Sequence, residues 1–300
     1  MHSQPHQWKG KTGGGKIGQK SLFFMLKRID VSVFYPLLYI IVPFYMLFAR
    51  KRYLAIIRYF KQCYQLPALK SFWETFMNHI VFGQIVLDKF AILAGNRKHL
   101  KTEIKGKQYF YQSAERDTGI IVVSCHAGNF EAGGFILNEH KKRVNSLIYG
   151  GETEVLKNKR KKILESVNIN PISAEDDMSH LFLIKQALEN GEILTVLCDR
   201  TFGNSKTVKH NFLGREAAFP LAPFMLAVQI NVPIFALFVM KKNFRKYQAY
   251  IIPIETDNNP NDDNTIKKAR QLCISFIGHC EDIVRKYPRQ WFNFYDFWAE

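Results

Sequence analysis

The sequence predicts an α/β protein: a mixed, largely parallel central sheet flanked by helices, with an N-terminal hydrophobic helical membrane anchor. From about residue 100 onward, short apolar runs alternate with helix-length segments, which is typical of a layered sheet. The 300 residues are 47% hydrophobic and 23% charged, a composition that suits a globular core. The anchor is indicated by an uncharged run at residues 31–49.

We expect three regions along the chain: a flexible basic leader at 1–28, a membrane-associating helical region at 29–98, and an α/β domain at 99–300. The leader is polar and contains Gly13, Gly14 and Gly15 in succession. It lacks the preceding strand, the lysine and the serine or threonine of a phosphate-binding loop. We find neither an internal repeat nor a domain linker.

As one straight helix, the uncharged run would be about 28 Å long, close to the thickness of the hydrocarbon core. Lys27 and Arg28 precede it and basic residues at 50–52 follow it, so the positive-inside rule gives no orientation. Pro36 and Pro43 predict bends in such a helix. We therefore favour a kinked, re-entrant or shallow helix with both ends in the cytoplasm. A single span and a buried helix of a soluble protein are the alternatives.

The formal net charge of +16 is concentrated at the N-terminal end, where eleven Lys or Arg residues up to Lys61 are opposed by Asp30 alone. Such a basic end usually meets phosphate, either in lipid headgroups or in nucleic acid. The sequence has no helix-turn-helix pattern, RNA-binding aromatic motif or zinc finger to support nucleic acid. Its five cysteines are scattered, with no C-x-x-C pair, so we expect no disulfide framework and no metal site, as in a reducing cytosol.

Periodicity predicts the remaining elements in order. Residues 53–96 read as helical with a break at Pro67, and Phe72, Phe76, Ile80 and Gln84 form a partly apolar face. Strands are expected as a pair near 102–111 and at 119–125, 144–149, 193–198, 233–240 and 246–253. Helices are expected from about 129, at 154–167, 178–189 and 221–229, and from about 265 to 286.

His126 is the first candidate for a catalytic residue. It directly follows the apolar strand at 119–125, so it should lie beyond the carboxyl end of that strand, where open α/β sheets bind ligands. A histidine there can remove a proton near neutral pH, and a carboxylate such as Glu131 can fix its tautomer. Alternatively, His126 caps a helix or bonds within the core, and Glu131 is an ordinary first-turn acid. Cys125 should point to the opposite side, which favours a small buried hydrophobe over a thiol nucleophile.

Three arginines are candidates for holding a phosphate or an acceptor oxygen. Asp199 and Arg200 follow the strand at 193–198, where the aspartate would position the arginine unless the two form a structural ion pair. Arg215 is a weaker member of this set, and Arg160 lies in a basic cluster at 157–162. That cluster is either a solvated helix face or a contact for anionic headgroups or donor phosphates.

The tail at residues 288–298 is unusually aromatic. Most tails of this composition pack onto the body of the protein. The alternative is a position at the membrane interface, where amphipathic aromatic rings are favoured.

Four blocks occur in order along the chain: His-Ala-Gly-Asn-Phe-Glu at 126–131, Leu-Cys-Asp-Arg at 197–200, Asn-Phe-Leu-Gly-Arg-Glu-Ala-Ala-Phe-Pro at 211–220 and Asn-Val-Pro-Ile at 231–234. The first resembles the His-x4-Asp/Glu signature of the lysophospholipid acyltransferase superfamily, with the Gly-Asn-aromatic insert of its late lipid A acyltransferase branch. The others are similar to that branch's strand-end aspartate, the segment before its next helix and its Val-Pro block. One departure is the absence of an arginine after the strand at 144–149, a place that Lys157 or Arg160 can fill from the next helix.

The resemblance, which covers roughly residues 119–253, implies an acyltransferase domain on the cytoplasmic face of the bacterial inner membrane, with no metal or cofactor. His126 would remove the proton of a hydroxyl on a lipid or glycolipid acceptor, and Glu131 would hold the imidazole. The hydroxyl would attack a fatty acyl thioester on acyl carrier protein or coenzyme A directly, without an acyl-enzyme. Backbone N–H groups near Gly128 or basic side chains would stabilise the oxyanion. The substrate-binding candidates are Asn129, Arg160, Asp199, Arg200 and Arg215.

Two other functions stay open on the sequence. One is N-acyl transfer to an amine-bearing lipid, whose base-stable amide product would differ from a labile ester. The other is a non-catalytic membrane-binding or nucleic-acid-binding module that uses the basic N-terminus and binds in a salt-sensitive way.

Overall fold

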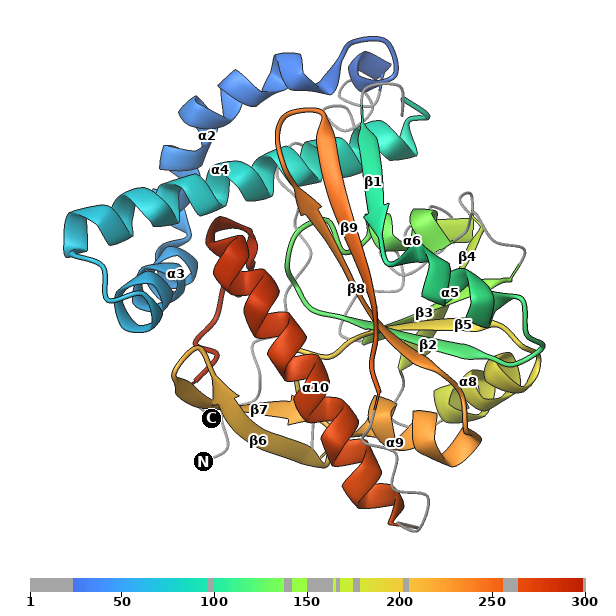
Figure 1. Ribbon diagram of the computed structural model, residues 1–300. Coiled ribbons are helices and arrows are strands. Elements are labelled where there is room, and N and C mark those ends of the chain that lie inside the picture. The colour runs from blue at the N-terminus through green and yellow to red at the C-terminus, as the bar shows by residue number, and fades with distance from the viewer. Residues whose placement is uncertain are drawn as a thin grey trace.

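A computed structural model describes residues 24–96, 100–137, 142–149, 164–165, 168–174, 179–201, 205–255 and 264–298. Its centre is a seven-stranded sheet in the order β1-β9-β8-β2-β5-β3-β4 (Figure 1). The strands are β1 (Lys101–Lys105), β2 (Ile120–Ser124), β3 (Val144–Tyr149), β4 (Ile169–Ala174), β5 (Ile193–Leu197), β8 (Ile234–Lys241) and β9 (Lys246–Pro253). All neighbours are parallel except β8 and β9, which form an antiparallel pair. The predicted mixed, largely parallel sheet is therefore confirmed.

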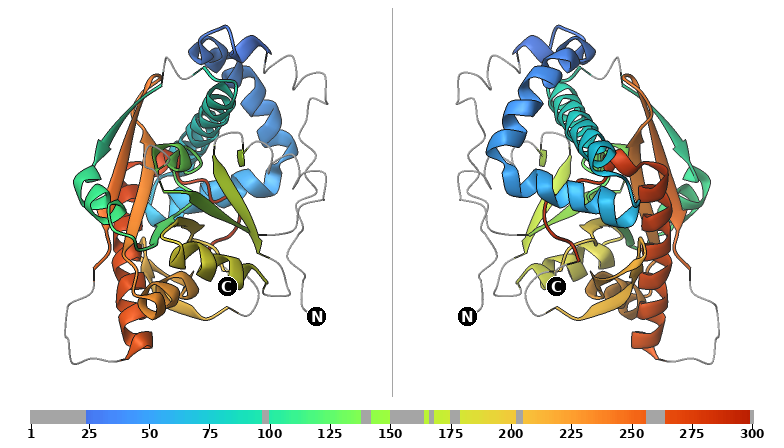
Figure 2. Two further views of the ribbon diagram at one scale, coloured as in Figure 1. Left: turned by 90° about the vertical axis from the view of Figure 1, so that its right-hand side faces the viewer. Right: turned by 90° about the vertical axis from the view of Figure 1, so that its left-hand side faces the viewer.

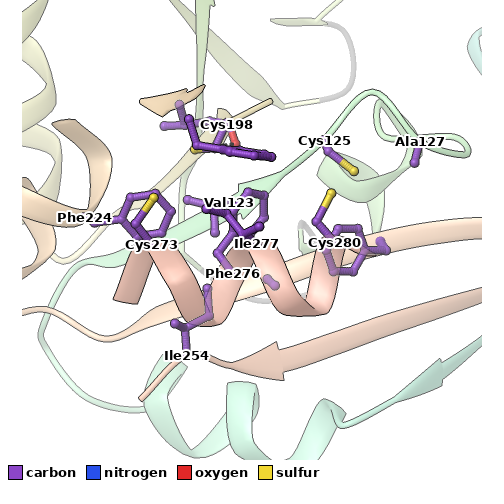
Figure 3. Packing of buried hydrophobic residues seen from close by; sticks show 14 of the residues in the cluster. Val123, Cys125, Ala127, Cys198, Phe224, Ile254, Cys273, Phe276, Ile277 and Cys280 are labelled. Carbon is purple, nitrogen blue, oxygen red and sulfur yellow. Dashed lines mark hydrogen bonds between the residues drawn. The ribbon is translucent and has the colours of Figure 1, made fainter. Parts of the chain in front are cut away.

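Helices cover both faces of this sheet. They are α5 (Lys107–Ala114), α6 (Ala132–Leu137), α8 (Ser179–Glu189), α9 (Ala222–Ile230) and α10 (Thr265–Lys286). Along β2, Ile121 and Val123 belong to a core shared with α8, α9 and α10, whereas Ile120 and Val122 belong to a second core shared with α5 and α6. Because β2 is buried on both faces, its sequence is continuously apolar instead of alternating. Figure 3 shows the α10 side of this packing.

The N-terminal region consists of η1 (Val31–Phe34), α2 (Tyr35–Phe48), α3 (Arg50–Cys63) and α4 (Ala68–Leu93). The α2 helix lies along α4 at one end of the molecule, as both side views in Figure 2 show. Pro36 lies in the first turn of α2, and Pro43 lies inside the helix, which nevertheless continues to Phe48. The segment Val31–Phe48 is apolar and long enough to cross a membrane, and 28% of it is buried in the protein. It is the expected anchor candidate.

The expected face of α4 is buried at Ile80 and Gln84, whereas Phe72 is half exposed. The buried positions of α4 also include further polar residues, namely Ser71, Thr75, Asn78, His79 and Asp88. Ser71, Thr75 and His79 bond backbone carbonyls of α4 or of the residues just before it. Asp88 forms an ion pair with Lys241 of β8. Residues 288–298, which we call the C-terminal strap, pack against α4, and Asn78 donates to two of the strap's backbone carbonyls. The aromatic tail thus packs onto the body of the protein.

Several elements correct the expectations from sequence. In place of a strand pair at 102–111, β1 is followed by α5, because Gly106 turns the chain with a φ of 78°. The strand β4 and the hairpin of β6 (Thr207–Phe212) and β7 (Arg215–Pro220) were not predicted. Residues 1–23 of the expected leader and most of the helix expected at 154–167 lie outside the described residues. Leu26, at the end of the expected flexible leader, is instead buried in the core formed with η1, α2 and α4.

Candidate active site

His126 and Asp199 meet at the carboxyl edge of the sheet. β2 and β5 are parallel neighbours in which Ser124 is opposite Leu197, and the N–H of Cys198 donates to the carbonyl of Ser124 at 2.8 Å. Because the two strands end at the same level, the residues that follow them come together. This is the edge at which ligands bind in open α/β sheets.

The contact between the two residues has two parts. Nδ1 of His126 lies 2.7 Å from Oδ1 of Asp199, and the backbone N–H of His126 donates to Oδ2 at 2.8 Å. The carboxylate is 1% exposed and the imidazole 17% exposed. In the neutral ring, a proton on Nδ1 donated to Asp199 leaves the lone pair on Nε2, the nitrogen that can accept a proton.

The environment keeps Asp199 ionised. Burial alone would raise the pKa of its carboxyl group, but the charge of His126, two hydrogen bonds from His126 and the Arg200 guanidinium outweigh burial. The net result is a pKa below the usual value. A permanently negative partner stabilises the protonated form of His126 when the ring has taken up a proton.

The loop that carries His126 is tightly shaped. Gly128 has a φ of +60°, and a Cβ atom there would lie 2.2 Å from the carbonyl oxygen of Val239, so only glycine fits. All four backbone N–H groups of residues 126–129 are engaged, with Asp199, Cys125, Gln290 and Val239 as their acceptors. These four N–H groups, which are among those expected to stabilise an oxyanion, therefore already have acceptors within the protein.

Glu131, expected to hold the imidazole, forms an ion pair with Lys89 of α4. Both side chains are partly exposed, at 39% and 34%. The carboxylate at Nδ1 of His126 is that of Asp199, a residue that the sequence grouped with Arg200 as a substrate contact. A signal was present in the sequence, since Asp199 follows a strand as His126 does, but only strand adjacency decides which carboxylate reaches the ring.

The other expected substrate contacts are spread over the site and its surroundings. Asn129 is buried, and its side-chain oxygen accepts the N–H of Ala132 at 3.2 Å, which starts the α6 turn. The guanidinium of Arg200 lies 5.3 Å from the ring centre of Tyr295, next to the His126–Asp199 pair. Arg215 lies elsewhere, over the Trp298 ring and bonded to Gln62.

The expected contact Arg160 lies outside the described residues. Among the residues that the structure describes, no group of three or more His, Cys, Asp or Glu side chains could hold a metal ion.

Cys125 points away from the site into the core, where its thiol faces Cys280 of α10 (Figure 3). The pKa of Cys125 is raised well above its usual value. Burial is the largest cause, and the neighbouring Cys280 is the next. A neutral, fully buried thiol is a poor nucleophile. The expectation that Cys125 is a small buried hydrophobe agrees with this environment.

Fold and site together define an α/β protein that presents a histidine, bonded to a buried carboxylate, at the carboxyl edge of a largely parallel sheet, and that carries an apolar N-terminal helix. Residues 76–299 match the family described as bacterial lipid A biosynthesis acyltransferases, and the chain belongs to that family. It is therefore an acyltransferase, as the four sequence blocks indicated. A comparison with curated proteins found no match.

Proposed function

We propose that this protein is a membrane-associated O-acyltransferase that moves a fatty acyl group from acyl carrier protein or coenzyme A to a hydroxyl of a lipid or glycolipid. The supporting observation is the 2.7 Å contact between Nδ1 of His126 and the buried Asp199, which leaves Nε2 as the basic nitrogen. Membership of the lipid A biosynthesis family supports the lipid acceptor and the acyl donor.

In this mechanism, Nε2 of His126 takes the proton of the acceptor hydroxyl as its oxygen attacks the carbonyl carbon of the thioester. The new C–O bond forms, the C–S bond breaks, and the leaving thiolate takes the proton back from His126. Asp199 keeps the ring in one tautomer and stabilises its protonated form. The high pKa of Cys125 supports direct transfer without an acyl-enzyme.

Arg200 is the cation that we assign to the oxyanion or to a phosphate of the donor. Its guanidinium is adjacent to Asp199 and lies over the Tyr295 ring, and its buried Nε has no hydrogen-bond partner in the part of the chain that the structure describes. A fixed cation at a developing negative charge stabilises the transition state. Lys89 belongs to the same edge, but Glu131 partly neutralises its charge.

We propose that α2 attaches the protein to the membrane by lying in the plane of the membrane surface. The apolar segment Val31–Phe48 is long enough to cross a membrane, but one side of it packs along α4. Tyr35, Leu38, Val42 and Met46 are buried on one stripe of α2, whereas Ile40 and Phe48 on other sides are 64% and 89% exposed. Because α2 is apolar all round and only one stripe of it packs against the protein, its other sides are free to enter the apolar part of a membrane.

The basic residues at 50–52, together with Lys27 and Arg28, would meet anionic headgroups at the edge of this surface. The five free cysteines and the cytosolic donors support the cytoplasmic face of the inner membrane. We propose that residues 29–98 form the membrane-associating part and residues 99–300 the acyltransferase domain.

The decisive experiment uses purified full-length protein in mixed micelles, with acyl carrier protein or coenzyme A thioesters and a bacterial lipid extract as acceptor. We expect release of thiol and a base-labile lipid ester. His126→Ala should lower the rate by about 10²–10⁴-fold while the circular dichroism spectrum is unchanged. Near-normal turnover in folded His126→Ala would refute the general base, and a base-stable amide product would show N-acylation instead.

A further inference from the structure

We infer that Gln290, in the C-terminal strap, is a positioning residue for His126. The inference rests on the proposed function of His126 as the base. It concerns a residue that lies 164 positions along the chain from His126, in the aromatic tail and outside the four family-like blocks.

The strap pairs with the loop that carries His126. The N–H of Phe292 donates to the carbonyl of His126 at 2.8 Å, and the N–H of Gly128 donates to the carbonyl of Gln290 at 2.8 Å. Between these bonds, Ala127 and Trp291 form an antiparallel bridge. The strap thus holds the backbone on both sides of Ala127, and together with Asp199 it places the imidazole.

The side chain of Gln290 fixes the strap in turn. Its Oε1 accepts the backbone N–H of Lys241 at 2.8 Å, and its Nε2 donates to the backbone carbonyl of Lys241 at 2.7 Å. Gln290 is 7% exposed, so these bonds are shielded from water. Lys241 ends β8, the strand whose Val239 carbonyl accepts the N–H of Asn129 at 2.7 Å. One side chain therefore sets the register between the strap, β8 and the His126 loop.

Other contacts hold the strap from the opposite side but do not reach the loop. Nδ2 of Asn78 donates to the carbonyls of Arg289 and Trp291 at 3.1 and 3.0 Å, and Arg289 forms an ion pair with Glu74. These contacts join the strap to α4. Gln290 joins the strap to β8 beside the His126 loop, and Tyr295 of the strap donates its hydroxyl to the carbonyl of Asp199 at 3.5 Å.

A neutral amide is the group that this place requires. It offers one donor and one acceptor to the N–H and carbonyl of a single residue. Leucine offers neither, and an ionised glutamate would face the Lys241 carbonyl with a second acceptor. A shift of the His126 loop by about 1 Å is enough to lower a rate by about 100-fold.

The test compares Gln290→Leu and Gln290→Glu with a matched control, Gln248→Leu. Gln248 is 2% exposed and donates Nε2 to backbone carbonyls of Glu103 and Ala249 at 2.9 and 3.3 Å, between β9 and β1. All three variants lose a buried amide, but only the first two touch the strap. Activity is measured per folded enzyme, well below the melting temperature, so that lost stability alone does not lower kcat.

We expect both Gln290 variants to lose about 10- to 100-fold in kcat with KM within about threefold of wild type. Deuterium exchange at residues 126–129 should become faster. The ratio of Gln290→Glu to wild-type kcat should rise as the pH falls, because the introduced carboxyl becomes a donor when it is protonated. Gln248→Leu should lose stability and keep its kcat.

Unchanged kcat and unchanged exchange in a folded Gln290 variant would overturn the inference while leaving the role of His126 intact. A fully active His126→Ala would instead remove the proposed function. If the two substitutions prevent folding, Gln290→Asn, which keeps both polar atoms one methylene short, gives the same readings. Equal kcat losses in Gln290→Leu and Gln248→Leu would show a merely structural effect.

Discussion

Asp199 bonds His126 at two points, the ring Nδ1 at 2.7 Å and the backbone N–H at 2.8 Å. One buried carboxylate thereby fixes the place of the residue and the orientation of its ring. Glu131, which the sequence signature pairs with the histidine, contacts Lys89 of the overlying α4. The two carboxylates therefore have different partners, and their substitution should affect the rate differently.

Asp199→Asn should lower kcat by about 10²–10⁴-fold, because the amide can turn its NH2 group toward the ring and favour the wrong tautomer. Glu131→Gln should have a smaller effect, since Glu131 bonds Lys89 at a partly exposed position. Steady-state kinetics of both purified variants is the measurement. A larger loss in Glu131→Gln than in Asp199→Asn would return the imidazole-holding role to Glu131.

Arg200→Gln should lower kcat by about 10²–10³-fold if the guanidinium stabilises the oxyanion. Arg200→Lys should recover only part of this loss, because an ammonium group lacks the planar fork over Tyr295. The matched control is Arg58→Gln, which breaks an exposed ion pair with Asp296. Equal rates in Arg200→Gln and the control would exclude a role for Arg200 in the chemical step.

Cys125→Ser should stay active, because the thiol is buried against Cys280 and its pKa is raised. The wild-type protein should also resist iodoacetamide in the folded state, since the thiolate is the reactive form. Intact-mass spectrometry after incubation with the acyl donor checks the mechanism directly. An acyl adduct on Cys125 would replace direct transfer by a two-step reaction.

The exposed side of α2 should control attachment. Ile40→Glu combined with Phe48→Glu should release much of the protein from membranes, because both side chains are more than half exposed. Phe182→Glu, a 70% exposed position on α8, is the control and should leave binding unchanged. Vesicle flotation with and without high salt is the measurement. Release of the wild type by salt alone would show that charge, not apolar insertion, holds the protein.

Stability should fall as the pH falls from about 7 to about 5. Burial lowers the pKa of His79 and of His279, and the carbonyl of Thr75 and the charge of Asp282 oppose this only in part. In the unfolded chain these rings take up protons near pH 6.5, so below that pH the unfolded state binds more protons than the folded state and is favoured. The loss levels off below the folded pKa values.

His79→Gln should remove part of this pH dependence, and His279→Gln a separate part. Urea unfolding of each variant and of the wild type at pH 7.5 and 5.5 provides the comparison. His79 packs against the rings of Tyr45 and Phe294, so its protonation would act on the contact between α4 and the strap. An identical difference between the two pH values in His79→Gln and in the wild type would contradict the prediction.

Sequence periodicity predicted the long, uninterrupted strands and helices well. The strand β9 and the helix α10 have the predicted bounds, because an uninterrupted period over 8 and 22 residues leaves little choice. The prediction failed at α5, which a glycine turn separates from β1 and which was expected as a strand, and at β4, β6 and β7. Short polar strands have weak periodicity, and their pairing partners decide whether they form.

The sequence by itself determined that His126 follows a buried strand, that an apolar segment precedes the α/β domain, and that the chain carries the motifs of its family. These features are local, and periodicity or spacing reveals them. The tertiary structure alone decided that Asp199, 73 residues away, holds His126, and that Gln290 meets Lys241. Such contacts depend on which strands become neighbours and how they align, and the free energy that selects that arrangement comes from burial over the whole sheet.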